Sequence, residues 1–152
     1  MGGVLADWNV QHGQAAGIRV EMVQWRTHVF PATGKRPQEF INKQAFDRSD
    51  IVVGIFWSKF GTPTGRFASG TEEELRRGIV QRKAVMVYFS RIPLPKGSGK
   101  PLDSVKIDAF KRKLGQKALY WEYSTLDSFE NDFRNHLAMV MQDLQKRHKM
   151  RK

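Results

Sequence analysis

One apolar run near the middle of the chain limits the available folds more than any other feature. Residues 51–57 (IVVGIFW) are apolar almost without alternation, and residues 84–89 (AVMVYF) repeat the pattern. A strand with one solvated face alternates apolar and polar residues, whereas a strand covered on both faces of a parallel sheet does not. Both runs therefore predict buried strands of a parallel sheet.

Weaker periodic patterns predict the remaining elements. Apolar residues recurring every three or four positions indicate helices, and alternating ones indicate strands. The predicted helices cover residues 3–13, 37–48, 71–82, 107–114 and the segment from 126 onward, and the other strands cover 18–25 and 118–123. Regular alternation of helices and strands favours a doubly wound α/β fold with a mostly parallel sheet, here of about four strands.

Two apolar faces predict how the terminal helices pack. In the first helix, Val4, Leu5 and Trp8 share one face. In the last helix the apolar stripe is Leu126, Phe129, Phe133, Leu137, Val140 and Leu144, and we expect its first four members in the core. We expect one domain over residues 1–145 and a basic tail over residues 146–152.

Composition restricts the class of protein. The chain has 152 residues, which is one domain's worth, and no cysteine, so disulfides, thiolate nucleophiles and cysteine-based zinc sites are excluded. No apolar run approaches the roughly 20 residues of a membrane span, and the first residues show no secretory signal pattern. We therefore expect a bacterial-type cytoplasmic protein without a membrane partner.

The net charge of +11 raises the question of a polyanionic partner. The excess of Lys and Arg is spread over several segments, and no RRM, KH or helix-turn-helix pattern is present. A solvated basic surface explains the charge without a partner. Nucleic-acid binding therefore ranks last among the functions considered.

The residues that follow the 51–57 strand form the candidate ligand site. Ligands of open parallel sheets bind beyond the carboxyl ends of the strands, where a Gly- and Thr-rich loop over residues 59–69 leads into a helix. Gly61 and Gly65 in this loop, and Gly70 directly after it, permit close backbone approach. The loop lacks the GxxxxGK[ST] pattern, and the glutamates at 72–74 would repel phosphate, so a triphosphate site is not expected.

Several side chains are candidates for contacting a ligand there. Trp57 either stacks on a base or nicotinamide ring or packs in the core. His28 either lines the cleft or lies on the surface, and loop hydroxyls either bind ribose or phosphate or bond their own backbone. No metal-ligand spacing links the histidines, so no metal site is predicted. The candidate substrate-binding residues are Trp57, Gly61, Thr62, Thr64, Ser69, Gly70, Thr71 and His28.

Glu74 is the candidate catalytic residue, and its position allows two interpretations. Thr71-x-x-Glu74 has the spacing of a capping box, and the helix dipole favours a carboxylate in the first helical turn. The same dipole would hold the carboxylate ionised at the mouth of a cleft, with a low pKa. An ionised carboxylate suits a nucleophile, or an electrostatic partner of an oxocarbenium-like sugar cation, better than a general acid.

Two sets of residues resemble known families. Gly70–Glu74 (GTEEE) resembles the G-T-x-x-E motif of nucleoside 2-deoxyribosyltransferases, which implies a catalytic nucleophile at Glu74. The wider chain resembles a bacterial TIR-like domain family of unknown function. The segments that carry this resemblance are VQWRTH (23–28), RPQEFINKQ (36–44), DIVVGIFWSKFGTPT (50–64), SGTEEE (69–74) and VMVYFS (85–90).

The TIR-like resemblance implies a fold and a ligand. The implied fold is a three-layer, flavodoxin-like or TIR-like α/β fold, and the implied ligand is NAD or a nucleotide as substrate, with no bound cofactor. In TIR NADases a comparable Glu supports cleavage of the nicotinamide–ribose bond, in a defence or signalling context. Members usually begin with a strand ahead of the helix that here covers residues 3–13, so we expect the usual first strand to be missing. Arg26 also stands where the family has an acidic residue.

Three functions follow, in order of preference. The first is cleavage or transfer of an N-glycosidic bond of NAD or a nucleotide, with Glu74 at the anomeric carbon. The second is a non-catalytic TIR-like interaction module that self-associates or binds a protein partner. The third is a basic nucleic-acid-binding protein.

Overall fold

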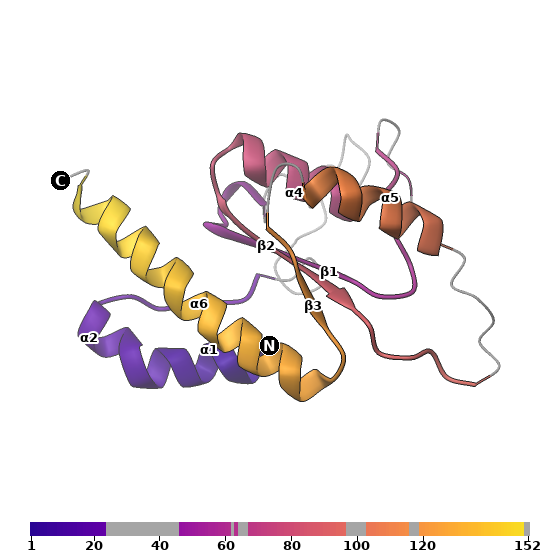
Figure 1. Cartoon of the computed structure of the whole chain (residues 1–152). Helices are drawn as coiled ribbons and strands as arrows, with labels where there is room; N and C mark the ends of the chain where they lie inside the picture. The colour runs from indigo at the N-terminus through magenta and orange to yellow at the C-terminus, as the bar shows by residue number, and fades with distance from the viewer. Residues whose placement is uncertain (24–45, 62, 64–66, 97–102, 116–118, 151–152) are drawn as a thin grey trace, which may run out of the picture. The chain divides into compact units, whose positions relative to one another are not determined.

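The chain divides into two compact units, and both of its ends contribute to the first (Figure 1). The structure, a computed structural model, describes residues 1–23, 46–61, 63, 67–96, 103–115 and 119–150. The first unit combines Met1–Val23 with Thr125–Lys152, and the second spans Gln24–Ser124. The single domain expected over residues 1–145 stays a prediction.

The second unit is built on a parallel sheet of three strands in its described residues. β1 (Ile51–Phe56), β2 (Ala84–Ser90) and β3 (Trp121–Tyr123) lie in the order β1-β2-β3, and both neighbouring pairs are parallel. Ile51 to Phe56 stand opposite Ala84 to Phe89, so the two apolar runs form neighbouring strands. The predicted α/β class, with helices flanking a parallel sheet as in a flavodoxin-like fold, is confirmed.

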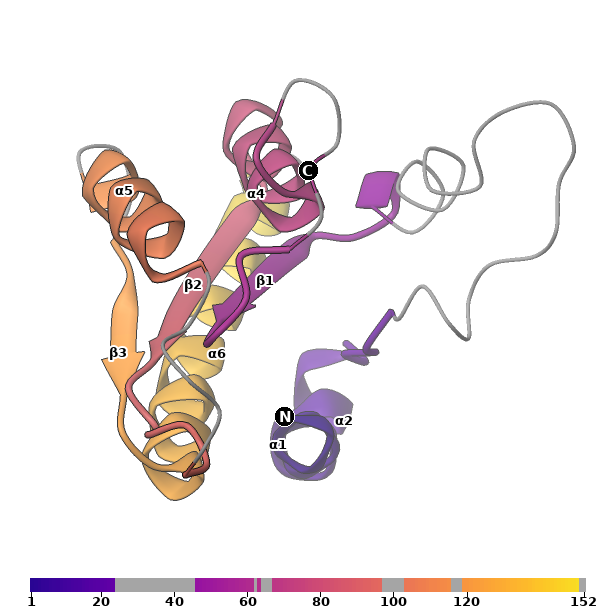
Figure 2. The same cartoon turned by 90° about the vertical axis from the view of Figure 1, so that its right-hand side faces the viewer.

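Helices α4 (Gly70–Val80) and α5 (Ser104–Gly115) cover the same face of this sheet (Figure 2). Two glycines allow α4 to approach closely. A Cβ built on Gly54 of β1 would lie 2.8 Å from Cδ1 of the fully buried Leu75, and one built on Gly78 would lie 3.0 Å from Cγ2 of Val85. At 2.8 Å the Leu75 side chain would have to shift, and 3.0 Å is tighter than most real Cβ contacts, so both positions favour glycine.

An aromatic cluster fills the core beneath these helices. The Phe56 ring stacks on Phe60 and Phe89, with centroid distances of 5.5 and 5.2 Å, and Phe110 of α5 packs against all three rings. Because Phe60 belongs to the loop after β1, the core fixes the first part of that loop. The buried core cluster comprises Phe46, Val52, Phe56, Phe60, Leu75, Val87, Phe89, Ile107, Phe110 and Leu114.

The first unit contains two helical segments that lie side by side. One consists of α1 (Gly2–Trp8), the π-helix η1 (Asn9–Gly13) and α2 (Gln14–Ala16), and the other is α6 (Leu126–Lys149). The Met1 amino group pairs with Glu130 at 3.4 Å, and Asp7 pairs with Arg134 at 2.9 Å. These pairs advance together along both segments, so the segments run in the same direction.

The N-terminal helix confirms one prediction and corrects another. Val4, Leu5 and Trp8 are buried, as their shared face predicts. The helical segment does not end at Gly13 but continues to Ala16, because η1 accommodates Gly13 within the helix. Gly17 then ends it in the left-handed region at φ 62°, a conformation that glycine adopts without strain.

The strand predicted over residues 18–25 is wrong for Ile18–Val23, which belongs to no strand; the remainder lies outside the described residues. The reason is a competition for the backbone hydrogen bonds of this segment. The Asn9 side chain donates to the Val20 carbonyl and accepts from the Val20 N–H, both at 2.8 Å. These bonds satisfy the groups that a neighbouring strand would otherwise bind. Most of the helix predicted over 37–48 also lies outside the described residues.

The buried stripe of α6 differs from the predicted one at its start. Phe129, Phe133, Leu137 and Met141 are buried, whereas Leu126, the first helical residue, is 68% exposed, so its predicted core position is wrong. The buried residues therefore recur every four positions, whereas the predicted stripe combined spacings of three and four residues. No helix among the described residues combines the length and apolarity that crossing a membrane would require.

Candidate functional site

Ser69 joins the loop after β1 to the start of α4. Its backbone is extended, and its Oγ accepts a hydrogen bond from the Glu72 N–H at 3.0 Å. The side chain is fully buried. The capping box predicted at Thr71 and Glu74 is therefore wrong: the cap lies two residues earlier, and Thr71 and Glu74 lie inside the helix.

Among the described residues, Glu72 carries the buried carboxylate, with 9% of the residue exposed. This residue is not singled out in the sequence analysis. Its Oε2 accepts from the Ala68 N–H at 3.3 Å, and its Oε1 contacts Nε and Nη2 of Arg76 at 2.9 and 2.8 Å. The carboxylate thus holds the loop to the helix. The spacing Ser69-x-x-Glu72 is a second match to the capping pattern, and it could have identified this residue.

Gly61 brings the loop back against the start of α4. Its φ of 106° lies in the region that favours glycine, and a Cβ placed on it would lie 3.1 Å from Cβ of Ser69. The predicted close approach therefore exists, but in the described structure it is made to Ser69. The Ser69 hydroxyl is enclosed by this contact and directed to the Glu72 N–H.

Trp57 follows β1 and is partly exposed, with its indole N–H held by a hydrogen bond. Its side chain is 45% exposed, and its indole N–H donates to the Ile92 carbonyl at 2.7 Å. Ile92 follows β2, and its own N–H donates to Ser90 Oγ at 3.2 Å. The hydrogen bond fixes the ring beside the carboxyl ends of β1 and β2 and leaves part of it accessible for stacking.

A second carboxylate, Asp103, anchors the other side of the loop. Its Oδ2 accepts from the Phe60 N–H at 3.0 Å, and its Oδ1 pairs with Lys106 at 3.2 Å. The hydrogen bond from Phe60, reinforced by Lys106, lowers the pKa of Asp103 below its ordinary value. Asp103 therefore ties the loop after β1 to the start of α5.

Glu74 lies one turn inside α4 and is half-buried. Burial, followed by the negative charge of Glu73, raises the pKa of Glu74 above its ordinary value. The prediction that the helix dipole would lower this pKa is wrong. The dipole is felt within the first turn, whereas desolvation and the neighbouring carboxylate act on Glu74 directly.

The structure brings together one part of the predicted site. Gly61, Ser69, Gly70 and Thr71 meet at the start of α4, and Gly70 and Thr71 are half-buried. The predicted residues His28, Thr62 and Thr64 lie outside the described residues. In the part of the chain that is described, no group of three His, Cys, Asp or Glu residues could hold a metal.

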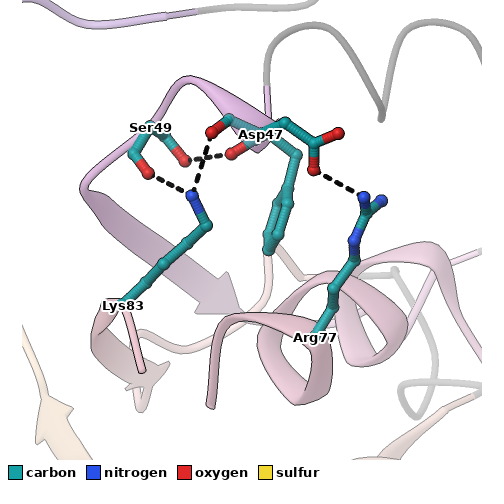
Figure 3. A network of polar contacts seen from close by, with 5 residues as sticks. Asp47, Ser49, Arg77 and Lys83 are labelled. Atoms are coloured by element: carbon teal, nitrogen blue, oxygen red, sulfur yellow. Dashed lines mark hydrogen bonds and ion pairs between the residues drawn. The ribbon is translucent and has the colours of Figure 1, made fainter. Parts of the chain in front are cut away.

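A second polar network lies at the opposite, amino end of β1 (Figure 3). Lys83 donates to the backbone oxygens of Asp47, at 3.3 Å, and of Ser49, while Arg77 of α4 pairs with the Asp47 carboxylate at 2.5 Å. Both cations also lie over the Phe46 ring, at 4.9 and 5.1 Å from its centroid. Since these charges are satisfied inside the cluster, we interpret it as a clamp that fixes the segment before β1 to α4.

Comparison with known proteins gives a family for the chain. A family model described as "Domain of unknown function (DUF4062)" matches residues 13–138, a range that includes the whole candidate site. No curated protein and no solved structure matches the chain. The matching description names neither a TIR domain nor a deoxyribosyltransferase, so the chemistry has to be argued from the residues.

Proposed function

This chain belongs to the DUF4062 family, and on the geometry of its residues we propose that it cleaves or transfers an N-glycosidic bond of NAD or a nucleotide. The observation that carries the proposal is Glu74, a half-buried carboxylate with a raised pKa near the start of α4. The resemblance of GTEEE to the deoxyribosyltransferase motif, and of the wider chain to TIR-like domains, supports the same role.

A partly desolvated carboxylate suits attack on a sugar carbon. Loss of water and a raised pKa make the ionised group a stronger nucleophile, while pH above that pKa keeps it ionised. A Glu74 oxygen bonds to the anomeric carbon as the glycosidic C–N bond breaks, and the base leaves with the bonding electron pair. Water, or a second base, then attacks the same carbon, displaces the carboxylate and loses a proton. That proton balances the charge of a purine or pyrimidine released as an anion, whereas nicotinamide leaves NAD as a neutral molecule and the proton goes to solvent.

The neighbouring residues would support this step without taking part in it. Ser69 and Glu72 hold the loop and the start of α4 in one arrangement, which fixes the position of Glu74. The accessible part of the Trp57 ring offers a stacking surface for a nicotinamide or a base. The substrate therefore lies beyond the carboxyl ends of β1 and β2.

The experiment compares two adjacent carboxylates. The chain is incubated with NAD and a panel of nucleosides and nucleotides, and the released base is quantified by chromatography. Glu74→Gln is expected to lower turnover by about a thousandfold, because the nucleophile is lost. Both variants are assayed at a pH above the raised pKa of Glu74, where Glu73→Gln removes a charge one residue away, leaves Glu74 ionised and is expected to keep turnover within about threefold. The proposal would be overturned if the native chain showed no more turnover than Glu74→Gln.

A second candidate is a non-catalytic interaction module. It is favoured because the loop's described polar groups are largely used inside the protein: Ser69 by Glu72, and the Trp57 indole by Ile92. Large apolar side chains are also exposed on the second unit, with Ile55 at 42% and Trp121 at 48%. Light scattering across a concentration series tests it. A mass that stays monomeric at every concentration would count against self-association.

A further inference from the structure

Trp57 and Ser90 are linked by two hydrogen bonds that share one residue, Ile92. The Trp57 indole N–H donates to the Ile92 carbonyl at 2.7 Å, and the Ile92 N–H donates to Ser90 Oγ at 3.2 Å. Ser90 is the last residue of β2 and is half-buried, whereas Trp57 is 45% exposed. A hydroxyl at the end of one strand therefore holds, through one backbone residue, the exposed ring that follows another strand.

The Ile92 carbonyl has little freedom to turn away from the indole. Arg91, the residue before Ile92, donates its backbone N–H to the Tyr123 carbonyl of β3 at 2.7 Å. Pro93 follows Ile92, and a proline restricts the preceding residue to extended dihedral angles. Ser90 adds the bond to the Ile92 N–H, so the backbone on both sides of Ile92 is constrained. The indole N–H therefore meets an acceptor whose direction is set by the chain around it.

We propose that Ser90 is a positioning residue, which orients the Trp57 ring for stacking on the base of the substrate. The inference rests on the proposed function, in which the accessible part of this ring stacks on a nicotinamide or a base. Stacking depends on orientation, since aromatic pairs favour offset-stacked or edge-to-face arrangements. Because the indole N–H is already used by Ile92, the ring offers the base a flat face and no hydrogen-bond donor. The contact therefore selects for a planar ring and not for one particular base.

The bond between Ile92 and Ser90 also has a purely local explanation, which makes a different prediction. Serine side chains often bond to the backbone two residues further on, in turns that bind nothing. In that case, replacing Ser90 would change the stability of the chain without a specific effect at Trp57. The positioning role predicts instead that the indole N–H of Trp57 loses protection, because its acceptor is released.

Solvent exchange of the Trp57 indole N–H, measured by NMR, tests this link without relying on activity. The chain has four tryptophans, and Trp57→Phe identifies the Trp57 signal by its loss. Ser90→Ala is expected to accelerate the exchange about fivefold, the scale set by one hydrogen bond. Ser90→Thr keeps a hydroxyl and is expected to exchange as the native chain does.

Ser49→Ala is the matched control for this measurement. It removes another half-buried serine hydroxyl of the second unit, one that donates to the Phe46 carbonyl at 2.8 Å before the amino end of β1. The chemical change equals that of Ser90→Ala but lies at the opposite end of the strand. Ser49→Ala is therefore expected to leave exchange of the Trp57 indole N–H unchanged.

Binding is measured with NAD as the probe, in a Glu74→Gln background that prevents turnover. There Ser90→Ala is expected to weaken NAD binding about threefold to tenfold, the range for one aromatic pair, and Ser90→Thr is expected to restore it. In the chain that retains Glu74, Ser90→Ala is expected to raise KM and to keep kcat within about twofold, because stacking acts on the substrate and the transition state alike.

The outcomes separate this proposal from the proposed function. Unchanged indole exchange in Ser90→Ala would overturn the role of Ser90, as would equal acceleration in Ser49→Ala. Faster exchange with unchanged NAD affinity would also overturn it, because the orientation of the ring would then not matter for binding. NAD binding that Ser90→Ala weakens, together with no turnover above that of Glu74→Gln, would overturn the proposed function alone and support the role of Ser90.

Discussion

At the scale of single residues, the pKa of Glu74 can be changed without altering Glu74 itself. Burial is the larger cause of its raised pKa, and the charge of Glu73 is the second. Glu73→Gln removes the second cause, so the pKa of Glu74 falls. If the ionised carboxylate is the working form, the acidic limb of the pH–rate profile moves to lower pH. A ¹³C NMR titration of the Glu74 carboxyl follows the same shift without relying on activity. Asp108→Asn, a charge removed from α5, serves as the control and should leave the titration unchanged.

Asp103 gives a residue-scale prediction with the opposite sign. Its pKa is lowered in the folded chain, so its contribution to stability is present above the ordinary Asp pKa and is lost as pH falls through the folded value. Asp103→Asn is therefore expected to be less stable than the native chain near neutral pH, and the difference is expected to shrink as pH falls below the ordinary Asp pKa. Urea unfolding over this pH range measures the difference. A gap that stays constant with pH would show that this carboxylate has no lowered pKa.

At the scale of elements, the sequence predicts best the strands whose two faces are both covered. The runs at 51–57 and 84–89 form neighbouring strands because a parallel strand needs apolar residues on each face. The first residue of α4 is harder to predict from the sequence, because Ser69-x-x-Glu72 and Thr71-x-x-Glu74 both match a capping pattern. In the structure Ser69 Oγ caps the Glu72 N–H, and Gly61 packs against Ser69. That contact, like the one between Asn9 and Val20, is not local in sequence, so no spacing rule reveals it.

The crossing of α4 over β1 supplies an element-scale prediction. In Gly54→Ala the new methyl would lie 2.8 Å from Leu75 Cδ1, so Leu75, which is fully buried, has to move. We expect a loss of about 1–3 kcal/mol in the free energy of unfolding, measured in urea. Gly3→Ala, with no atom within 4 Å of its new Cβ, should be neutral or slightly stabilising. In Gly54→Ala/Leu75→Ala the smaller residue at position 75 makes room for the new methyl group. The double variant should therefore lose less free energy of unfolding than the two single variants lose together.

At the scale of the whole molecule, one compact unit is assembled from both ends of the chain, and the sheet lies in the other. Sequence periodicity detects the helices of both units but not this division, because it depends on contacts between segments more than one hundred residues apart. The ion pairs Met1–Glu130 and Asp7–Arg134 are examples of such contacts. Whether the two units also behave as one domain, as expected over residues 1–145, is a question about cooperativity, and a substitution in α6 can answer it.

Phe133 is 1% exposed on the buried face of α6, so Phe133→Ala should cost about 3–5 kcal/mol in its own unit. Leu126→Ala, at a 68% exposed position of the same helix, should cost less than about 0.5 kcal/mol and serves as the control. Amide hydrogen exchange then measures the protection of the amides in each unit separately. If the units unfold independently, Phe133→Ala accelerates exchange in α6 while the amides of β1 and β2 keep their protection. If the chain is one cooperative domain, all of these amides lose protection by the same free energy. We expect the second result, because the apolar core of a 152-residue chain is of single-domain size, and retained protection in the sheet would refute it.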